Sequence, residues 1–243
     1  MPAMAPSPPL AIAMPMASDM SHLAQLRLWQ LISPALPVGA YAYSQGLEYA
    51  VEAGWVGDEA SALKWIGGQL GNSLAWLDLP ILLRLHAAWG DGDLATVQAW
   101  NLQLLAARET QELRAEDQQL GAALQRLLVD LKLPRVDGWS TLHTPTTFAT
   151  MFALATSQWQ VTAADAAQGY AWAWCENQIA AAIKLVPLGQ TAGQRLLCAL
   201  LPQIVAAAQH AATLEDAQIG ASLPGVAVAS ALHETQYSRL FRS

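Results

Sequence analysis

Apolar residues recur every three or four positions along most of this chain, the spacing that places them on one face of an α-helix. The clearest such run covers residues 109–131, where leucines stand at 113, 120, 124, 127, 128 and 131. β-Branched residues never alternate with polar ones over a useful length, so strands are not indicated. The sequence therefore predicts an all-α protein, a single globular domain of about ten short helices.

Prolines and glycines mark where these helices end. Ser33 precedes Pro34, and a residue before proline is excluded from the helical conformation, so the first helix stops there. The helices predicted in this way span residues 26–32, 43–53, 58–71, 74–89 (with a kink or break at Pro80), 93–107, 109–131, 146–158, 162–184, 190–200 and 202–212. Residues 134–145 are expected to form a loop. So many short, interrupted helices argue against a simple four-helix bundle.

Local side chains support several of these boundaries. Asp58 and Thr162 stand where a side-chain oxygen can cap the first turn of a helix. Gly67 and Gly68 lie inside a predicted helix, where each costs about 1 kcal/mol relative to alanine. A close approach of another helix to this pair would compensate for that cost, and we expect one there.

The composition limits the classes of partner. Hydrophobic residues make up 53% of the chain and charged residues 13%, which indicates apolar surface for partners to cover. The net charge is −7, and no Lys/Arg stripe offsets it, so nucleic acid is not an expected partner. Residues 196–214 are apolar but interrupted by Pro202, Gln203, Gln209 and His210, which favours a buried helix pair over a membrane span.

The proline-rich residues 1–20 lack a basic segment and a continuous apolar stretch, so they are interpreted as a disordered leader and not a signal peptide. Cys175 and Cys198 lie in Ala- and Leu-rich helical stretches, which predicts buried, reduced thiols in a cytoplasmic protein.

The sequence also lacks the common catalytic and metal-binding motifs. It contains no phosphate-binding G-x-x-x-x-G-K-[ST] loop, no H-x-x-x-H or C-x-x-C pair, and no G-x-S-x-G elbow. The best-placed acids are interpreted as solvated helix faces: Glu48, Glu52, Glu109, Glu112 and Glu116. These absences predict a protein that is not an enzyme, with no resident cofactor and no metal site of its own.

Three segments carry a resemblance to a known family. They read SPALPVGAYAYSQGLEYAVEAGWV at residues 33–56, NQIAAAIKLVPLGQTAGQRLL at 177–197 and HETQYSRLFRS at 233–243. In this order and spacing they resemble the urease accessory protein F (UreF) family, over roughly residues 22–243.

The resemblance implies a function and a set of partners. Members of this family are all-helical, non-enzymatic scaffolds that tend to dimerise and take part in nickel insertion into urease. They bind the urease D/H accessory protein, recruit and modulate the accessory GTPase that delivers nickel, and meet the urease apoprotein through that complex. Nickel is expected to be delivered through the complex and not clearly bound by this chain.

The same resemblance implies the partner-binding residues. They are Tyr41, Ser44, Gly46 and Glu48 from the first segment, and His233, Tyr237, Arg239, Leu240 and Phe241 from the last. The family implies a core at residues 21–222 and a tail at 223–243 that orders when a partner binds. An arginine over a tyrosine ring gains cation–π attraction, so Arg239 and Tyr41 are a candidate pair.

Other interpretations remain open. From its residues alone, the tail fits a closing helix packed on its own core as well as an interface. A helical enzyme or binding protein is the alternative function, with a small-molecule pocket walled by Trp159, Trp172 and Trp174. A dimeric interaction module of an unrelated pathway differs from the urease scaffold only in the identity of its partner.

Overall fold

The computed structural model describes residues 17–243, and every regular element in that range is helical. The α-helices are α1 (Ala17–Leu31), α2 (Leu47–Glu52), α3 (Glu59–Gln69), α4 (Asp78–Asp91), α5 (Leu94–Ala106), α6 (Gln111–Asp130), α7 (Val136–Ser140), α8 (Phe148–Gln158), α9 (Ala163–Leu185), α10 (Gln190–Thr213) and α11 (Pro224–His233). Short turns of other helix types cover Ala40–Ala42 (η1), Leu70–Leu74 (η2) and Asp216–Gln218 (η3). The prediction of a single all-α domain is confirmed. Residues 1–16 of the expected leader lie outside the described residues.

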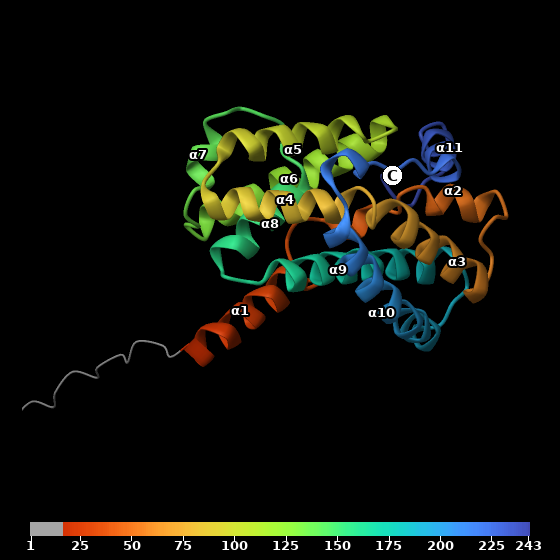
Figure 1. Cartoon of the computed structure of the whole chain (residues 1–243). Helices are drawn as coiled ribbons and strands as arrows, with labels where there is room; N and C mark the ends of the chain where they lie inside the picture. The colour runs from red at the N-terminus through yellow and green to blue at the C-terminus, as the bar shows by residue number, and fades with distance from the viewer. Residues whose placement is uncertain (1–16) are drawn as a thin grey trace, which may run out of the picture.

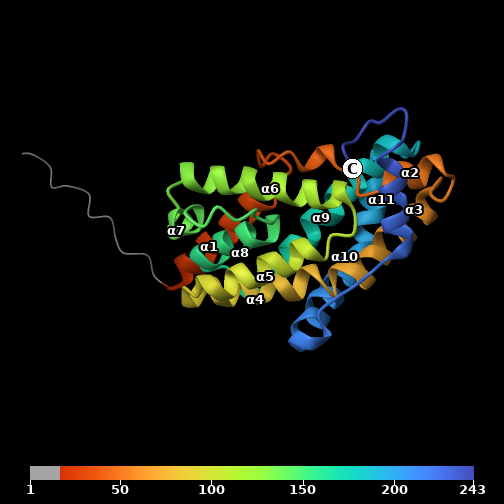
Figure 2. The same ribbon diagram turned by 90° about the horizontal axis from the view of Figure 1, so that it is seen from above.

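The helices surround a central one, α8, whose residues from Ala149 to Thr156 are all buried. Helix α4 packs on α8 and on α5, and α9 packs on α10 (Figure 1). Seen from above, α2, α11 and the C-terminus gather at one end of the molecule, far from α7 (Figure 2). Helix α1 projects below the body in this view (Figure 1).

Two glycines decide how closely helices approach. A Cβ built on Gly121 of α6 would lie 2.0 Å from the Thr146 carbonyl oxygen, so only glycine fits where the chain enters α8. A Cβ on Gly67 would lie 2.7 Å from Oε1 of Gln203 in α10. Gly68 faces open space. The expected close approach therefore exists at Gly67 and not at Gly68.

The predicted caps are confirmed. The Asp58 side chain accepts from the Ser61 amide, and Ser61 bonds back to the Asp58 amide, so α3 begins with a complete capping box. Thr162 accepts from the Asp165 amide at the start of α9. These caps depend on side chains within one turn, which is why the sequence alone could place them.

Several predicted breaks are wrong. Pro80 is the third residue of α4, where its missing N–H would have no partner within the helix in any case, so it neither kinks nor breaks α4. Pro202 lies inside one continuous helix, α10, with buried residues on either side at Leu200 and Ile204. The packing of α10 on α9 offsets the lost hydrogen bond. The expected loop at 134–145 contains α7, which buries Trp139 against Trp89 with ring centroids 5.8 Å apart.

The two cysteines differ in environment. Both thiols are free; Cys175 is buried and Cys198 is exposed, so the prediction of burial is wrong for Cys198. Burial raises the pKa of Cys175 to about 12, which makes that thiol unreactive.

Helix α10 is the one described helix long and apolar enough to cross a membrane by length and composition. One such helix is weak evidence, because core helices of soluble proteins pass the same test.

Candidate functional site

The first and last of the three segments singled out in the sequence meet in space. Tyr43 is extended, the chain then turns at Gln45 and Gly46, which have left-handed φ values of 54° and 79°, and α2 starts at Leu47. A Cβ on Gly46 would lie 3.1 Å from the Ala229 Cβ and from the Ser230 amide nitrogen, so glycine also lets α11 come close. The tail then runs alongside this extended stretch (Figure 1).

Backbone bonds fix that pairing. The Arg242 amide donates to the Ala42 carbonyl at 2.8 Å, and the Ser44 amide donates to the Ser243 carbonyl at 2.7 Å. The Ser44 hydroxyl donates to the same carbonyl at 2.6 Å. Ser44 and Ser243 are both fully buried. These short contacts hold the end of the tail against the entrance to α2.

Glu48 is the acceptor at the centre of the site. Its carboxylate is only 7% exposed, and it accepts from the Leu240 amide at 2.6 Å and from the Phe241 amide at 2.8 Å. His233 Nε2 lies 3.1 Å from the same carboxylate. A buried carboxylate is stable only when such donors replace water. Glu48 therefore ties α2, α11 and the tail together.

His233 lies between two carboxylates. Its side chain is fully buried, with Nδ1 2.7 Å from Glu112 Oε2 on α6 and Nε2 facing Glu48. Arg239 Nη1 donates to the other Glu112 oxygen at 2.7 Å. A second buried link joins the same helices, because the Thr110 and Ser230 hydroxyls lie 2.7 Å apart. The tail is thus bonded to α6 as well as to α2.

Glu116 accepts hydrogen bonds from two neutral donors, one of which is on the tail. The Ser243 hydroxyl donates to its Oε2 at 2.7 Å, and Gln45 Nε2 donates to its Oε1 at 2.8 Å. Removal from water dominates its electrostatics and raises the pKa of Glu116 to about 7.

The interpretation of Glu48, Glu112 and Glu116 as solvated is wrong. The sequence contained a signal of this burial. Glu116 and Asp117 stand between Leu113 and Leu120, three or four residues from each, and this helical spacing places them on the leucine face.

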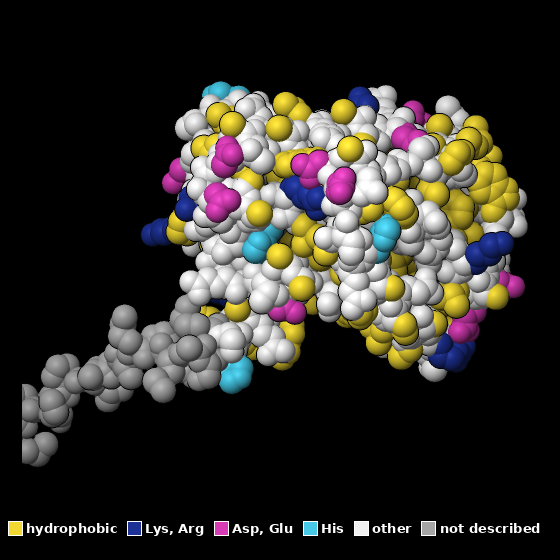
Figure 3. All heavy atoms as spheres, viewed as in Figure 1, with side chains coloured by type: hydrophobic (Ala, Val, Ile, Leu, Met, Phe, Trp, Pro, Cys, Tyr) yellow, Lys and Arg dark blue, Asp and Glu magenta, His cyan; other side chains and the backbone are white. Residues whose placement is uncertain are grey.

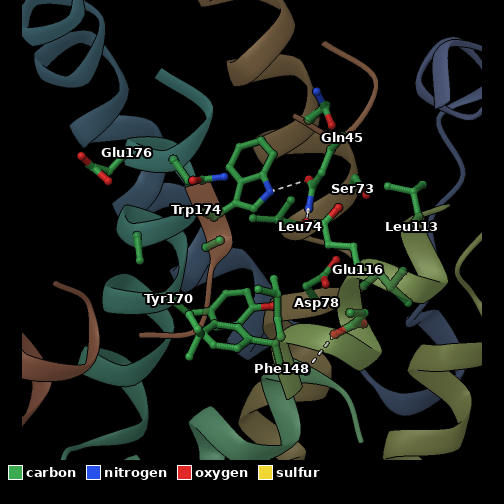
Figure 4. A pocket seen from close by; sticks show the side chains of 18 of the residues that line it. Gln45, Ser73, Leu74, Asp78, Leu113, Glu116, Phe148, Tyr170, Trp174 and Glu176 are labelled. Atoms are coloured by element: carbon green, nitrogen blue, oxygen red, sulfur yellow. Dashed lines mark hydrogen bonds between the residues drawn. The ribbon is translucent and has the colours of Figure 1, made fainter. Parts of the chain in front are cut away.

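Behind Glu116 lies a cavity of about 230 Å³ (Figure 4). Gln45, Asp78, Phe148, Tyr170 and Trp174 are among the side chains that line it, and Trp174 Nε1 donates to Gln45 Oε1 at 2.8 Å. Of the three tryptophans expected to wall a pocket, only Trp174 lines this one.

A buried ion-pair network forms part of the cavity wall. Arg108 bonds Asp78 at 2.6 Å and Asp117 at 2.8 Å. Burial opposes the charge of Arg108, but the carboxylates of Asp117 and Asp78 outweigh it and raise the pKa of Arg108 well above its usual value. Burial, together with the charges of Asp78 and Asp117, raises the pKa of Tyr170. The network holds α4, α6 and the start of α8 in place, since Asp117 also accepts from the Phe148 amide.

The predicted partner-binding residues divide into two groups. Ser44, Gly46, Glu48, His233 and Phe241 are buried, whereas Tyr41, Tyr237, Arg239 and Leu240 are exposed. The cation–π contacts of the described residues are Arg27 over Trp159 and Lys184 over Phe241, so Arg239 does not stack on Tyr41. The buried group holds the tail, and the exposed group is what a partner could touch.

The surface shows few charges and much apolar area (Figure 3). An apolar patch lies at the end formed by α2 and α3, where Trp55 is exposed and meets Tyr49 edge-on with ring centroids 5.8 Å apart. Across residues 17–243 no three His, Cys, Asp or Glu side chains are grouped so as to hold a metal ion.

Comparison with known proteins identifies the family. The family model of UreF matches residues 56–201. The urease accessory protein UreF of Alkalilimnicola ehrlichii is 56% identical over 222 residues, which is 91% of this chain and 96% of that protein. The chain belongs to the UreF family. The UreF proteins of Teredinibacter turnerae and Hahella chejuensis are 52% and 49% identical, over 90% and 92% of this chain and 98% and 100% of their own lengths. The resemblance carried by the three segments is thereby confirmed, and the chain is a urease accessory protein by family.

Proposed function

We propose that this chain is a non-enzymatic scaffold of urease maturation. It binds the D/H accessory protein through its tail, recruits and modulates the GTPase that delivers nickel, and meets the urease apoprotein through that complex. The observation that supports this proposal most directly is the junction of the tail with the first family segment at Glu48. Nickel passes through the complex and is not bound by this chain as a resident cofactor.

The shape of the docked tail suits a partner-binding role. Tyr237 is fully exposed and Leu240 is mostly exposed, while the amides of Leu240 and Phe241 are bonded to the buried carboxylate of Glu48. Arg239 is half-exposed and keeps one side of its guanidinium toward solvent. Tyrosine and arginine carry much of the binding energy at protein interfaces. A tail held in one conformation also loses less entropy when a partner binds. That the tail orders on partner binding stays a prediction.

A homodimer and a cytoplasmic location are part of the same proposal. Helix α1 carries Leu26 and Trp29, each 55% exposed, and Leu23, 49% exposed. Such an apolar face on a projecting helix suits a second copy of the chain, which would cover it.

The proposal is tested by assembly. This chain is expressed with the D/H accessory protein and the accessory GTPase, and the complex is sized by light scattering with GTP and nickel present. Arg239→Ala removes a partly exposed ion pair worth less than about 1 kcal/mol, so the helical fold should persist while the three-protein complex is lost. Arg195→Ala, which removes an exposed ion pair with Glu59 between α10 and α3, is the matched control and should assemble normally. Unimpaired assembly by the Arg239 variant would contradict the role of that residue.

A small-molecule binding protein is the second candidate, and the cavity beside Trp174 favours it. Native mass spectrometry of the purified chain distinguishes the two. A stoichiometric bound molecule that disappears in Trp174→Ala would favour the pocket function.

A further inference from the structure

Glu116 contacts both the end of the tail and the internal cavity. One oxygen accepts from Ser243 at the end of the tail, and the carboxyl also lines the internal cavity. We propose that release of the tail from this site is coupled to ionisation of Glu116, so that the tail docks less tightly as the pH rises through neutrality. The coupling is a property of this chain alone, and its effect on partner binding rests on the proposed function.

The geometry leaves Glu116 without a counter-charge. The side chain is 4% exposed, and its two hydrogen-bond donors, Gln45 and Ser243, are neutral. Among residues 17–243 no Lys, Arg or His forms an ion pair with Glu116. The nearest cation in the cavity wall, Arg108, is bonded to Asp78 and Asp117. An ionised Glu116 would therefore be a buried and unpaired charge.

The other charged groups around Glu116 do not supply the missing partner. Asp117 follows it on α6, and Tyr170 and Glu176 line the same cavity from α9. On the tail side, His233 and Arg239 both contact the Glu112 carboxylate. The titratable or charged groups that line the cavity or contact the tail are Tyr41, Glu48, Asp78, Arg108, Glu109, Glu112, Asp117, Tyr170, Glu176, Lys184, His233, Arg239, Arg242 and the main-chain end of Ser243. Acidic groups outnumber basic ones, which disfavours a further negative charge.

The sign of the effect follows from which state keeps the proton. With the tail docked, burial raises the pKa of Glu116 to about 7. With the tail released, water reaches the carboxyl, and its pKa falls toward the ordinary value of 4.5. The contribution of Glu116 to docking is thus complete below pH 4.5 and is lost as the pH rises through about 7. Between pH 6 and pH 8 the docking equilibrium should weaken roughly tenfold.

His233, held between Glu48 and Glu112, is another ionisable group that contacts the tail site. The test separates the two. Hydrogen exchange at the Leu240 and Phe241 amides, corrected for intrinsic rates, is measured on the full chain without partners at pH 6, 7 and 8. We expect the protection of these amides to fall about tenfold from pH 6 to pH 8.

Glu116→Gln should keep high protection at every pH, because the amide is neutral throughout. Glu176→Gln is the matched control: burial also raises the pKa of Glu176, and it lines the same cavity, yet it has no hydrogen bond to the tail. This control should retain the full pH dependence of the wild-type chain. A wild-type pH dependence that survives in Glu116→Gln overturns the proposal.

A second measurement guards against a variant that fails to fold. The Glu116 carboxyl is titrated by ¹³C NMR in the wild-type chain, and its midpoint should lie near pH 7, with amide protection falling as the pH approaches this value and levelling off above it. A carboxyl midpoint near the ordinary value of 4.5 overturns the coupling. Because no partner is present in either measurement, a negative result here leaves the scaffold function untouched, and failed complex assembly leaves this coupling untouched.

Discussion

Replacing Glu48 by glutamine should release the tail while leaving the helical core folded. The carboxylate accepts from the Leu240 and Phe241 amides, and His233 Nε2 lies 3.1 Å from it. Glutamine has nearly the same shape but only one acceptor oxygen, and its amide group is itself a donor. At least one buried N–H of the tail would then face another donor and have no acceptor. The substitution changes hydrogen bonding with little change in packing.

The magnitude can be worked from these bonds. Hydrogen bonds to a charged group contribute about 1.5–3 kcal/mol each, and an unsatisfied buried donor costs about 1–3 kcal/mol. One neutral bond survives in the variant, so we expect tail docking to weaken by about 3 kcal/mol, or roughly 150-fold. The core should lose little stability, since most of its buried side chains lie on other helices.

Hydrogen exchange and limited proteolysis measure this directly. In the variant, the Leu240 and Phe241 amides should lose protection, and trypsin should cleave after Arg239 and Arg242 much faster than in the wild-type chain. Glu52→Gln is the matched control, because Glu52 lies one turn further along α2 and is exposed. If the tail amides stay protected in Glu48→Gln, then Glu48 is not what holds the tail.

Two further predictions concern packing and assembly. Gly121→Ala should destabilise the fold by at least about 2 kcal/mol in urea unfolding, because its Cβ would overlap the Thr146 carbonyl, whereas Gly68→Ala in open space should stabilise it by up to about 1 kcal/mol. Equal urea midpoints for Gly121→Ala and Gly68→Ala would contradict this prediction, because they would show that the chain around Gly121 can shift to accommodate a Cβ. Leu26→Asp should convert a dimer to a monomer in light scattering without loss of helix, while Leu201→Asp, on the exposed face of α10, should leave the dimer intact. A dimer that persists in Leu26→Asp places the interface elsewhere.

The sequence could predict the helices because their signals are local. Asp58 and Thr162 cap helices through atoms within one turn, and the leucine repeat of α6 needs no partner to be recognised. The same locality explains the errors. The sequence predicts a helix end at Pro202, because proline interrupts an isolated helix. In the structure, packing against α9 keeps α10 continuous through Pro202. Trp139 lies in a segment that has no helical repeat, and its burial against Trp89 depends on another helix.

The candidate site shows the same limit more sharply. The family segments contain Glu48 and Leu240, but only the structure shows that these two residues, 192 positions apart, are bonded. A carboxylate on a helix looks solvated unless its donors are known, and here the donors come from the far end of the sequence.

By itself, the sequence determined the all-helical class, the helix ends set by local caps, and the family. The tertiary structure decided which carboxylates are buried and what the tail touches. The reason is physical: a helix forms from bonds between neighbours four residues apart, whereas burial of a charge is settled by whichever distant groups arrive to replace its water.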